Sequence, residues 1–176
     1  MDSKLNRLRL LNKTLEPPQE IGGLFLPIGL PERFEFMFVA EMPAMGVPKK
    51  KQGKRIINFN ATARDRFLQE MMIKYGVEGS YVTDIVKKRD RPRRPTPKEI
   101  QKWLPFLLKE IEIIKPGAII VLGRRTYEAS FRPYVEPRLR DKDIKVDHVF
   151  HYSNQVPRKK FERRFGKIIS RIRNSG

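Results

Sequence analysis

Seven consecutive, mostly apolar residues set the architecture of this chain: Phe34-Glu35-Phe36-Met37-Phe38-Val39-Ala40. Pro-containing segments bound the run on both sides, at Pro31 and Pro43. A short bulky run between such breaks is typical of a strand whose two faces are both covered. Three later runs have a similar character and are also predicted to be strands: Ser80–Val86, Ala118–Leu122 and Lys145–Phe150.

Helical patterns separate these strands. One begins at Ala61, with Phe67, Met71 and Tyr75 on one stripe, and ends at Gly76. The others are a long helix that starts at a Thr96–Glu99 capping box, a short helix near Thr126–Ser130, and a final helix with apolar residues from Phe161 to Ile172. Pro105 is expected to kink the long helix or to cost it a hydrogen bond.

Strands that alternate with helices, and that are apolar along their whole length, favour the α/β class, with a parallel sheet covered on both faces. In such folds the working residues sit in loops at the carboxyl ends of the strands. Four places qualify here: the loops after Ala40, Val86 and Phe150, and the turn at Gly123.

The chain has 176 residues, enough for one domain, and no cysteine. Disulfides, thiol nucleophiles and thiolate metal sites are therefore excluded. No run approaches the ~20 apolar residues of a membrane span, and the N-terminus lacks a secretory pattern. We expect an intracellular, cytoplasmic protein with an N-terminal extension over 1–31, which holds a short amphipathic helix, and one domain over 32–176.

The charge points to a polyanionic partner. Lys and Arg total 38 against 20 Asp and Glu, a formal net charge of +18. Such a field attracts nucleic acid, because Lys and Arg contacts to phosphate dominate that affinity. Colloidal solubility, ion pairing at the surface and binding to an anionic membrane remain alternatives.

Three polar residues stand out in or after the predicted strands: Glu41 follows the first strand, Asp84 lies inside the second among apolar residues, and His151 follows the last. The only histidines are His148 and His151, and without a cluster of further ligands they predict no metal site. An Asp84–His151–Ser153 triad lacks a nucleophile elbow. Nucleotide-binding glycine loops are absent as well.

Taken in order, these segments resemble the uracil-DNA glycosylase superfamily, and most closely its thermostable, iron–sulfur-containing branch. The matching stretches are Val39–Ala44, Tyr81–Lys87, Arg94–Ile100, Ile114–Arg124 and Phe150–Ser153. The family's counterparts are a G-E-A-P-G loop, an I-T-N-x-V-K strand, a P-T-P-x-E-I helix start, an I-x-P-x-x-I-x-x-L-G-R strand and turn, and an H-P-S loop. The resemblance covers residues 34–172.

The resemblance implies a three-layer α/β/α sandwich with a central four-stranded parallel sheet and a pocket for a flipped base. It assigns catalytic roles to Glu41, which places or activates water, and to His151, which supports the leaving base. Phe59 would stack on the base and Asp84 would read its edge. Ser153 would meet a backbone phosphate.

The sequence also departs from the family pattern. The cluster cysteines are absent, so we predict no cofactor. Ala40 and Ala44 replace glycines, and Tyr152 replaces a proline. Asp84 replaces an asparagine, which both donates and accepts, whereas an ionised aspartate only accepts. It would repel O4 of uracil but could accept from N3–H or from an exocyclic amine.

The sequence thus predicts a monofunctional DNA glycosylase that hydrolyses the N-glycosidic bond of uracil or another deaminated or modified base. We expect a monomer that grips DNA phosphates through Lys87, Arg124, Ser153 and Arg158. The alternative is a catalytically inactive nucleic-acid-binding relative of the same fold. A hydrolase of free nucleosides fits the strong positive charge less well.

Overall fold

The computed structural model describes residues 4–14, 35–43, 63–87, 93–152 and 156–175. Its sheet contains four strands: β1 (Phe36–Ala40), β2 (Tyr81–Asp84), β3 (Ala118–Leu122) and β4 (Lys145–Val149). They lie in the order β2-β1-β3-β4, and every neighbouring pair is parallel. The predicted four-stranded parallel sheet is confirmed.

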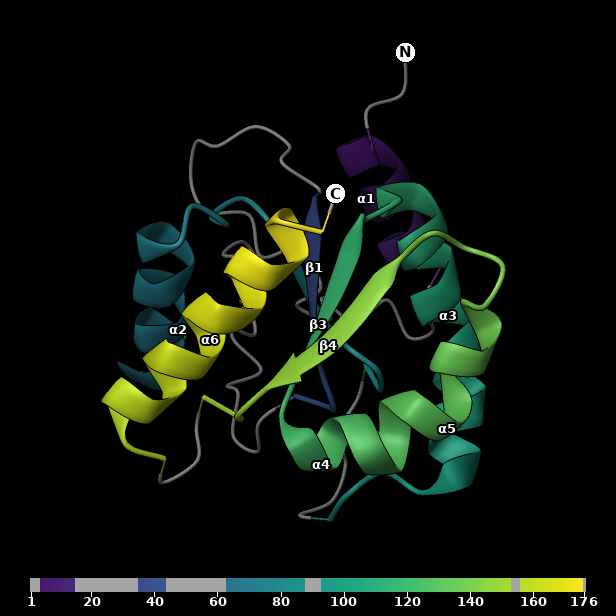
Figure 1. Cartoon of the computed structure of the whole chain (residues 1–176). Helices are drawn as coiled ribbons and strands as arrows, with labels where there is room; N and C mark the ends of the chain where they lie inside the picture. The colour runs from purple at the N-terminus through teal and green to yellow at the C-terminus, as the bar shows by residue number, and fades with distance from the viewer. Residues whose placement is uncertain (1–3, 15–34, 44–62, 88–92, 153–155, 176) are drawn as a thin grey trace.

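Helices cover both faces of the sheet. The longer ones are α1 (Lys4–Lys13), α2 (Ala63–Lys74), α3 (Pro97–Ile114) and α6 (Arg158–Arg173). Four short turns of helix join β3 to β4: α4 (Arg124–Thr126), the π-turn η1 (Tyr127–Phe131), α5 (Arg132–Tyr134) and the 3-10 turn η2 (Glu136–Arg138). Helices α2 and α6 lie on one face and α1, α3 and α5 on the other, which gives the predicted three-layer sandwich (Figure 1).

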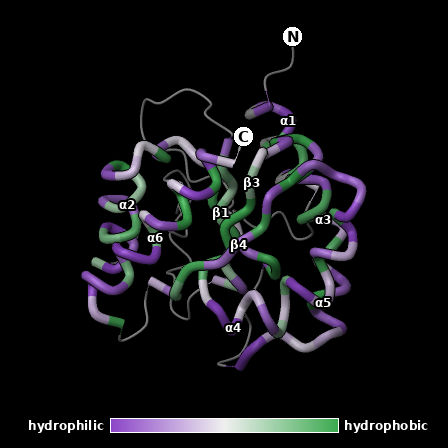
Figure 2. The backbone as a smooth tube through the Cα atoms, viewed as in Figure 1, coloured by the Kyte–Doolittle hydropathy of each residue, from purple (hydrophilic) through white to green (hydrophobic). Residues whose placement is uncertain are grey.

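Alternate side chains of each strand point to opposite helical layers. In β1, Phe36 and Phe38 join the core beneath α2 and α6, whereas Met37 and Val39 join the core beneath α3. Every residue of β1, β2 and β3 is buried. Figure 2 shows mostly hydrophobic residues in β1 and β3, and a mixture of hydrophobic and hydrophilic residues in β4 and in the surrounding helices.

Helix α3 begins where the sequence predicts. The Thr96 hydroxyl accepts from the Glu99 backbone, and a Glu99 carboxylate oxygen accepts from the Thr96 backbone at 2.7 Å. Arg93 and this cap together lower the pKa of Glu99 to about 2. The helix continues through Pro105 and ends at Lys115, which adopts a left-handed conformation with φ of 52° before Pro116.

The second strand is shorter than predicted. It ends at Asp84, although Ile85 and Val86 are also buried. Their N–H groups donate to the carbonyls of Ala40 and Glu41, at 2.9 and 3.0 Å, after the ladder itself has ended. Asp84 and Glu41 are thereby fixed on neighbouring strand ends.

Helix α1 packs against α3. Leu8 is buried in the core beneath α3, and the Lys4 ammonium donates to the carbonyl of Ile114 at 2.7 Å. The domain boundary predicted at residue 31 lies outside the described residues. In the described part of the chain, no helix is long and apolar enough to cross a membrane.

Candidate active site

The parallel topology brings three of the predicted residues to one edge of the sheet. Glu41 follows β1, Asp84 ends β2, and His151 lies two residues beyond the end of β4. Asp84 pairs in register with Ala40, the residue before Glu41. The carboxyl ends of parallel strands share one edge, where such folds carry their sites.

Gly123 brings His151 to this edge. It follows β3 with φ of 119°, a conformation that L side chains rarely adopt. A Cβ atom here would lie 3.0 Å from the Thr126 hydroxyl and 3.3 Å from the His151 Cβ. The glycine therefore allows both the turn into α4 and the close approach of the histidine.

Glu41 is clamped by two donors. The Arg94 guanidinium binds its carboxylate in a bidentate fashion, with Nε 3.0 Å from Oε2 and Nη2 against Oε1. The Ser130 hydroxyl donates to Oε1 at 2.6 Å. The hydrogen bond to Glu41 raises the pKa of Arg94. The carboxylate thus has a fixed orientation while its side chain stays 15% exposed.

Ser130 is buried and sits in the π-turn η1, where the Arg132 N–H bonds to the carbonyl of Tyr127. Pro133 follows this turn, and a proline strains an ordinary α-turn because it lacks the N–H donor. Single π-turns inside helices occur frequently at functional sites. Sequence analysis missed Ser130, because no motif or helical pattern announces a π-turn.

Arg94 was also missed as a site residue. It directly precedes the P-T-P-x-E motif, within the stretch Arg94–Ile100 on which the family resemblance partly rests. Its guanidinium points at Glu41, with a further contact to the carbonyl of Arg125 at 3.3 Å. The sequence feature that could have identified Arg94 is its position directly before the motif that caps α3.

Burial shifts His151 towards its neutral form. Burial lowers its pKa, and of the two nearby charges Glu41 raises it while Arg64 lowers it. The Glu41 charge therefore acts on the imidazole across the edge of the sheet. The ring stacks on Tyr152, with centroids 5.0 Å apart and planes 12° apart.

Asp84 lies near the same aromatic pair. Its side chain is buried, and its charge, together with that of Asp65, adds to the burial that raises the pKa of Tyr152. The Tyr152 hydroxyl donates to Asp65 at 3.0 Å. Tyr152, which stands where the family has proline, thus connects the His151 loop to β2 and α2.

Lys87 lies in the interior and not on the surface where a phosphate contact was predicted. Its ammonium pairs with the Glu110 carboxylate of α3, and both side chains are 1% exposed. It also bonds to the Thr83 hydroxyl and, at 2.6 Å, to the Asp84 carbonyl. An ammonium in this network supports the end of β2 from within and faces no DNA.

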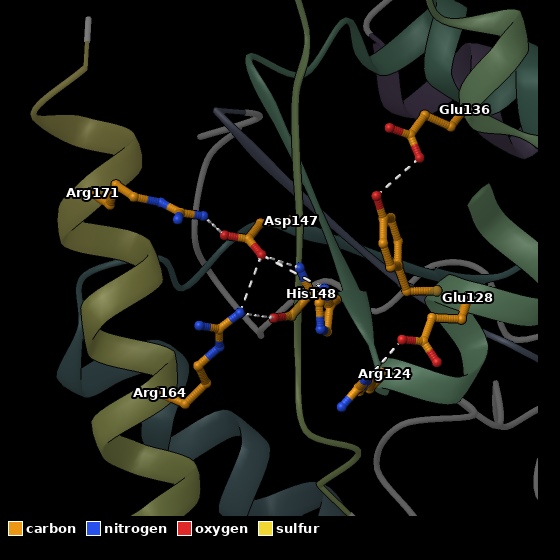
Figure 3. Close-up of polar contacts among 8 residues, drawn as sticks. Arg124, Glu128, Glu136, Asp147, His148, Arg164 and Arg171 are labelled. Atoms are coloured by element: carbon orange, nitrogen blue, oxygen red, sulfur yellow. Dashed lines mark hydrogen bonds and ion pairs between the residues drawn. The ribbon is translucent and has the colours of Figure 1, made fainter.

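Arg124 and Arg158 lie on the surface. Arg124 is 73% exposed and pairs with Glu128 at 2.7 Å (Figure 3). Arg158 is exposed at the start of α6, with its guanidinium 4.9 Å from the ring centre of Phe67. Phe59 and Ser153 lie outside the described residues.

His148, the second histidine, faces away from this cluster. It stacks on Tyr127 at 4.8 Å, and burial lowers its pKa. Across the described ranges, no three His, Asp or Glu side chains gather closely enough to hold a metal ion.

The chain is similar in sequence to known proteins. A sequence profile of the Uracil DNA glycosylase superfamily matches residues 30–173. The type-4 uracil-DNA glycosylase of Archaeoglobus fulgidus is 33% identical over 96 residues, 53% of this chain and 45% of the relative. That of Saccharolobus solfataricus is 31% identical over 99 residues, 56% of this chain and 44% of the relative.

Each match spans less than half the length of these curated relatives. The profile, in contrast, covers most of this chain, including all four strands and the three strand-end residues. The chain belongs to the uracil-DNA glycosylase superfamily.

Proposed function

We propose that this protein is a monofunctional DNA glycosylase that hydrolyses the N-glycosidic bond of a deaminated or otherwise modified base. The observation that carries the proposal is the Glu41 carboxylate, held by Arg94 and Ser130 within the electrostatic reach of a neutral His151. A negative group and a hydrogen-bond donor at one strand-end edge fit the two charges that form in this reaction.

In the proposed reaction, the bond between C1′ and the base nitrogen breaks and its electron pair leaves with the base. Glu41 stabilises the positive charge that develops on the sugar. It also orients a water molecule whose oxygen bonds to C1′. The water's proton passes to Glu41 and then to solvent. His151 donates a hydrogen bond to the leaving base, which takes its final proton from solvent.

The target base must first leave the helix stack, at a cost of a few kcal/mol. Phe59 is proposed to stack on the extruded base, which would return ~1–3 kcal/mol. Arg124, Ser153 and Arg158 are proposed to contact the phosphates around it. The active unit proposed here is a cytoplasmic monomer with its glycosylase domain over residues 32–176.

Asp84 is proposed to set the choice of base. A carboxylate accepts hydrogen bonds from N–H groups but repels a carbonyl oxygen such as O4 of uracil. The Lys87 contact to its backbone carbonyl holds it at the end of β2. A base that donates to this carboxylate through an exocyclic amine, or through N3–H alone, fits it better than a base that presents O4 to it.

The proposal is tested with end-labelled duplexes that carry uracil, hypoxanthine, xanthine or a mismatched thymine, heated in alkali after incubation with the protein. We expect strand breaks at one or more of these bases, because alkali cleaves the abasic sites that a glycosylase leaves. Salt-sensitive binding to all four duplexes with no breaks in any would support the catalytically inactive relative instead.

Asp84→Asn tests the specificity assignment in the same assay. An asparagine amide donates to O4. The kcat/KM for uracil, divided by the kcat/KM for the base that the wild-type enzyme prefers, should therefore rise about tenfold. This change corresponds to ~1.4 kcal/mol, the contribution of one hydrogen bond. An unchanged ratio with full activity would remove Asp84 from base recognition.

A further inference from the structure

Among the helices that the structure describes, α6 contains the most Lys and Arg residues. Helix α6 contains eight Lys and Arg residues and a single acid, Glu162, which pairs with Lys74 of α2. Helix α3, on the opposite face of the sheet, contains three Lys and three Glu. Helices α6 and α3 therefore present very different surfaces to a charged partner.

Three of the α6 cations form a regular row. Lys159, Arg163 and Lys167, named here the basic stripe, are four residues apart and exposed. Residues at this spacing lie on one helix face, about 6 Å apart along the axis. No ion pair engages them within the described part of the chain, in contrast to Arg164 and Arg171, which turn towards Asp147 of β4 (Figure 3).

The stripe is unfavourable for the helix itself. Like charges four residues apart repel, and cations in the first turn oppose the helix dipole. The first turn of α6 contains Arg158, Lys159 and Lys160 with no acid. The packing of α6 rests on its apolar face, which includes the buried Phe161, Phe165 and Ile169. The exposed cations of the stripe therefore contribute nothing to the packing of α6.

Helix α6, which carries the stripe, starts at the same edge of the sheet as the candidate active site. Helix α6 follows the His151–Tyr152 loop and runs back along the sheet, since its last turn meets the start of β4 through a hydrogen bond from Lys145 to the Ile172 carbonyl at 3.2 Å. A polyanion at the strand-end edge could thus continue along α6 towards the opposite edge of the sheet (Figure 1).

We propose that the basic stripe binds the phosphate backbone of duplex DNA that flanks the target base. The identity of the partner as DNA rests on the proposed glycosylase function. The stripe spans about 12 Å from Lys159 to Lys167, over which one DNA strand presents about three to four phosphates. It lengthens the footprint beyond the extruded base and contributes affinity without reading sequence.

The test compares two variants of the full chain with the same loss of charge. Lys159→Gln/Arg163→Gln/Lys167→Gln removes the stripe, and Lys98→Gln/Lys102→Gln/Lys109→Gln removes three exposed lysines of α3. Binding is measured over a series of salt concentrations on duplexes of about 8 and about 20 base pairs, roughly 27 and 68 Å long. Circular dichroism and Tm confirm that both variants fold.

On the longer duplex, the stripe variant should reduce the slope of log K against log salt by about 2 to 3, at ~0.9 per phosphate contact. The short duplex should show a smaller change, and the α3 variant should leave both slopes near wild type. Equal losses in the two variants would overturn the proposal, because bulk charge would then explain them. A stripe variant with wild-type DNA binding but lost binding to phosphatidylserine vesicles or to RNA would also overturn it.

Single-turnover base release at saturating enzyme separates this inference from the proposed function. The stripe variant should match the wild-type rate there, because the chemical step does not use the stripe. If even the wild type releases no base from any duplex while the stripe still governs the salt slope, the glycosylase proposal fails and the DNA-binding stripe stands.

Discussion

At the scale of single residues, the best-defined feature of the site is the pair of donors on Glu41. Arg94 supplies a bidentate ion pair and Ser130 one buried hydroxyl. Donors on both carboxylate oxygens fix the plane of the carboxylate before substrate arrives, and preorganisation of this kind lowers the barrier to charge formation. Both residues position Glu41 and need not touch DNA.

Ser130→Ala removes one of these donors and leaves the other. We expect kcat to fall about tenfold, or ~1.4 kcal/mol, with KM nearly unchanged, because the hydroxyl acts through Glu41 and not on the substrate. Arg94→Lys should cost more, since an ammonium cannot reproduce the two-pronged contact. Ser130→Thr, which keeps the hydroxyl, is the control. If Ser130→Ala changed KM alone, the positioning role would be wrong.

The two histidines predict how stability depends on pH. Burial lowers the pKa of both His148 and His151, so the unfolded chain binds more protons than the native protein near their ordinary value of 6.5. The histidine contribution to stability is therefore complete above about pH 7 and is lost as pH falls towards 5.

Urea unfolding across this pH range checks the direction. The free energy of unfolding should decrease as pH falls from 7 to 5, and His148→Gln/His151→Gln should flatten the curve. Glu99, whose pKa is about 2, titrates below this window. A wild-type curve that rises as pH falls would contradict the lowered pKa values.

The sequence predicted the residues that end strands and missed those that depend on packing. Glu41 and His151 follow from the rule that parallel strands carry their chemistry at their carboxyl ends, whereas Asp84 was singled out by the family resemblance. Ser130 depends on a π-turn, and the burial of Lys87 depends on Glu110, 23 residues away on another element. Neither contact leaves a local pattern in the sequence.

At the scale of elements, caps and periodicity carried most of the information. The Thr96–Glu99 box predicts the start of α3, and the structure contains both of its hydrogen bonds. The end of β2 was placed two residues too late, because burial continues past the last ladder pair. Apolar residues indicate that a segment is buried. The strand itself ends where its backbone stops pairing with the neighbouring strand.

The network of Lys87 and Glu110 joins α3 to the end of β2. Glu110 also accepts hydrogen bonds from the hydroxyls of Tyr81, at 2.6 Å, and Thr83, at 3.1 Å. Burial raises the pKa of Tyr81 well above its ordinary value, and the negative charge of Glu110 adds to this. The network stiffens the strand that carries Asp84.

Glu110→Ala should destabilise the protein by about 3–5 kcal/mol, because it leaves the Lys87 ammonium buried and unpaired. Glu112→Ala, which breaks the exposed pair with Lys109, should leave the free energy of unfolding close to that of the wild type. Both values come from urea unfolding.

The double variant Lys87→Met/Glu110→Leu separates the effect of the unpaired charge from that of packing and hydroxyl contacts. It removes both charges, so it should be less destabilised than Glu110→Ala. A double variant as unstable as the single one would show that packing and hydroxyl contacts, and not the unpaired charge, dominate at this position.

At the scale of the whole molecule, the fold places the candidate catalytic residues at one edge of the sheet and the cationic helix α6 next to them. A net charge of +18 alone predicts a polyanionic partner but says nothing of where it binds. The structure shows where the relevant groups lie. The candidate catalytic residues are at the strand ends and the basic stripe is on α6, whereas α3, on the opposite face of the sheet, has equal numbers of Lys and Glu. This asymmetry follows from the order of the helices around the sheet.

The most direct test of the account is the single-turnover rate of base release by Glu41→Gln on the preferred substrate. Glutamine keeps the size of the side chain and removes its charge. We predict a loss of at least about 100-fold with Kd for the substrate within a few-fold of wild type, and Glu112→Gln within about twofold of the wild-type rate. A Glu41→Gln protein that releases the base at the wild-type rate would contradict it.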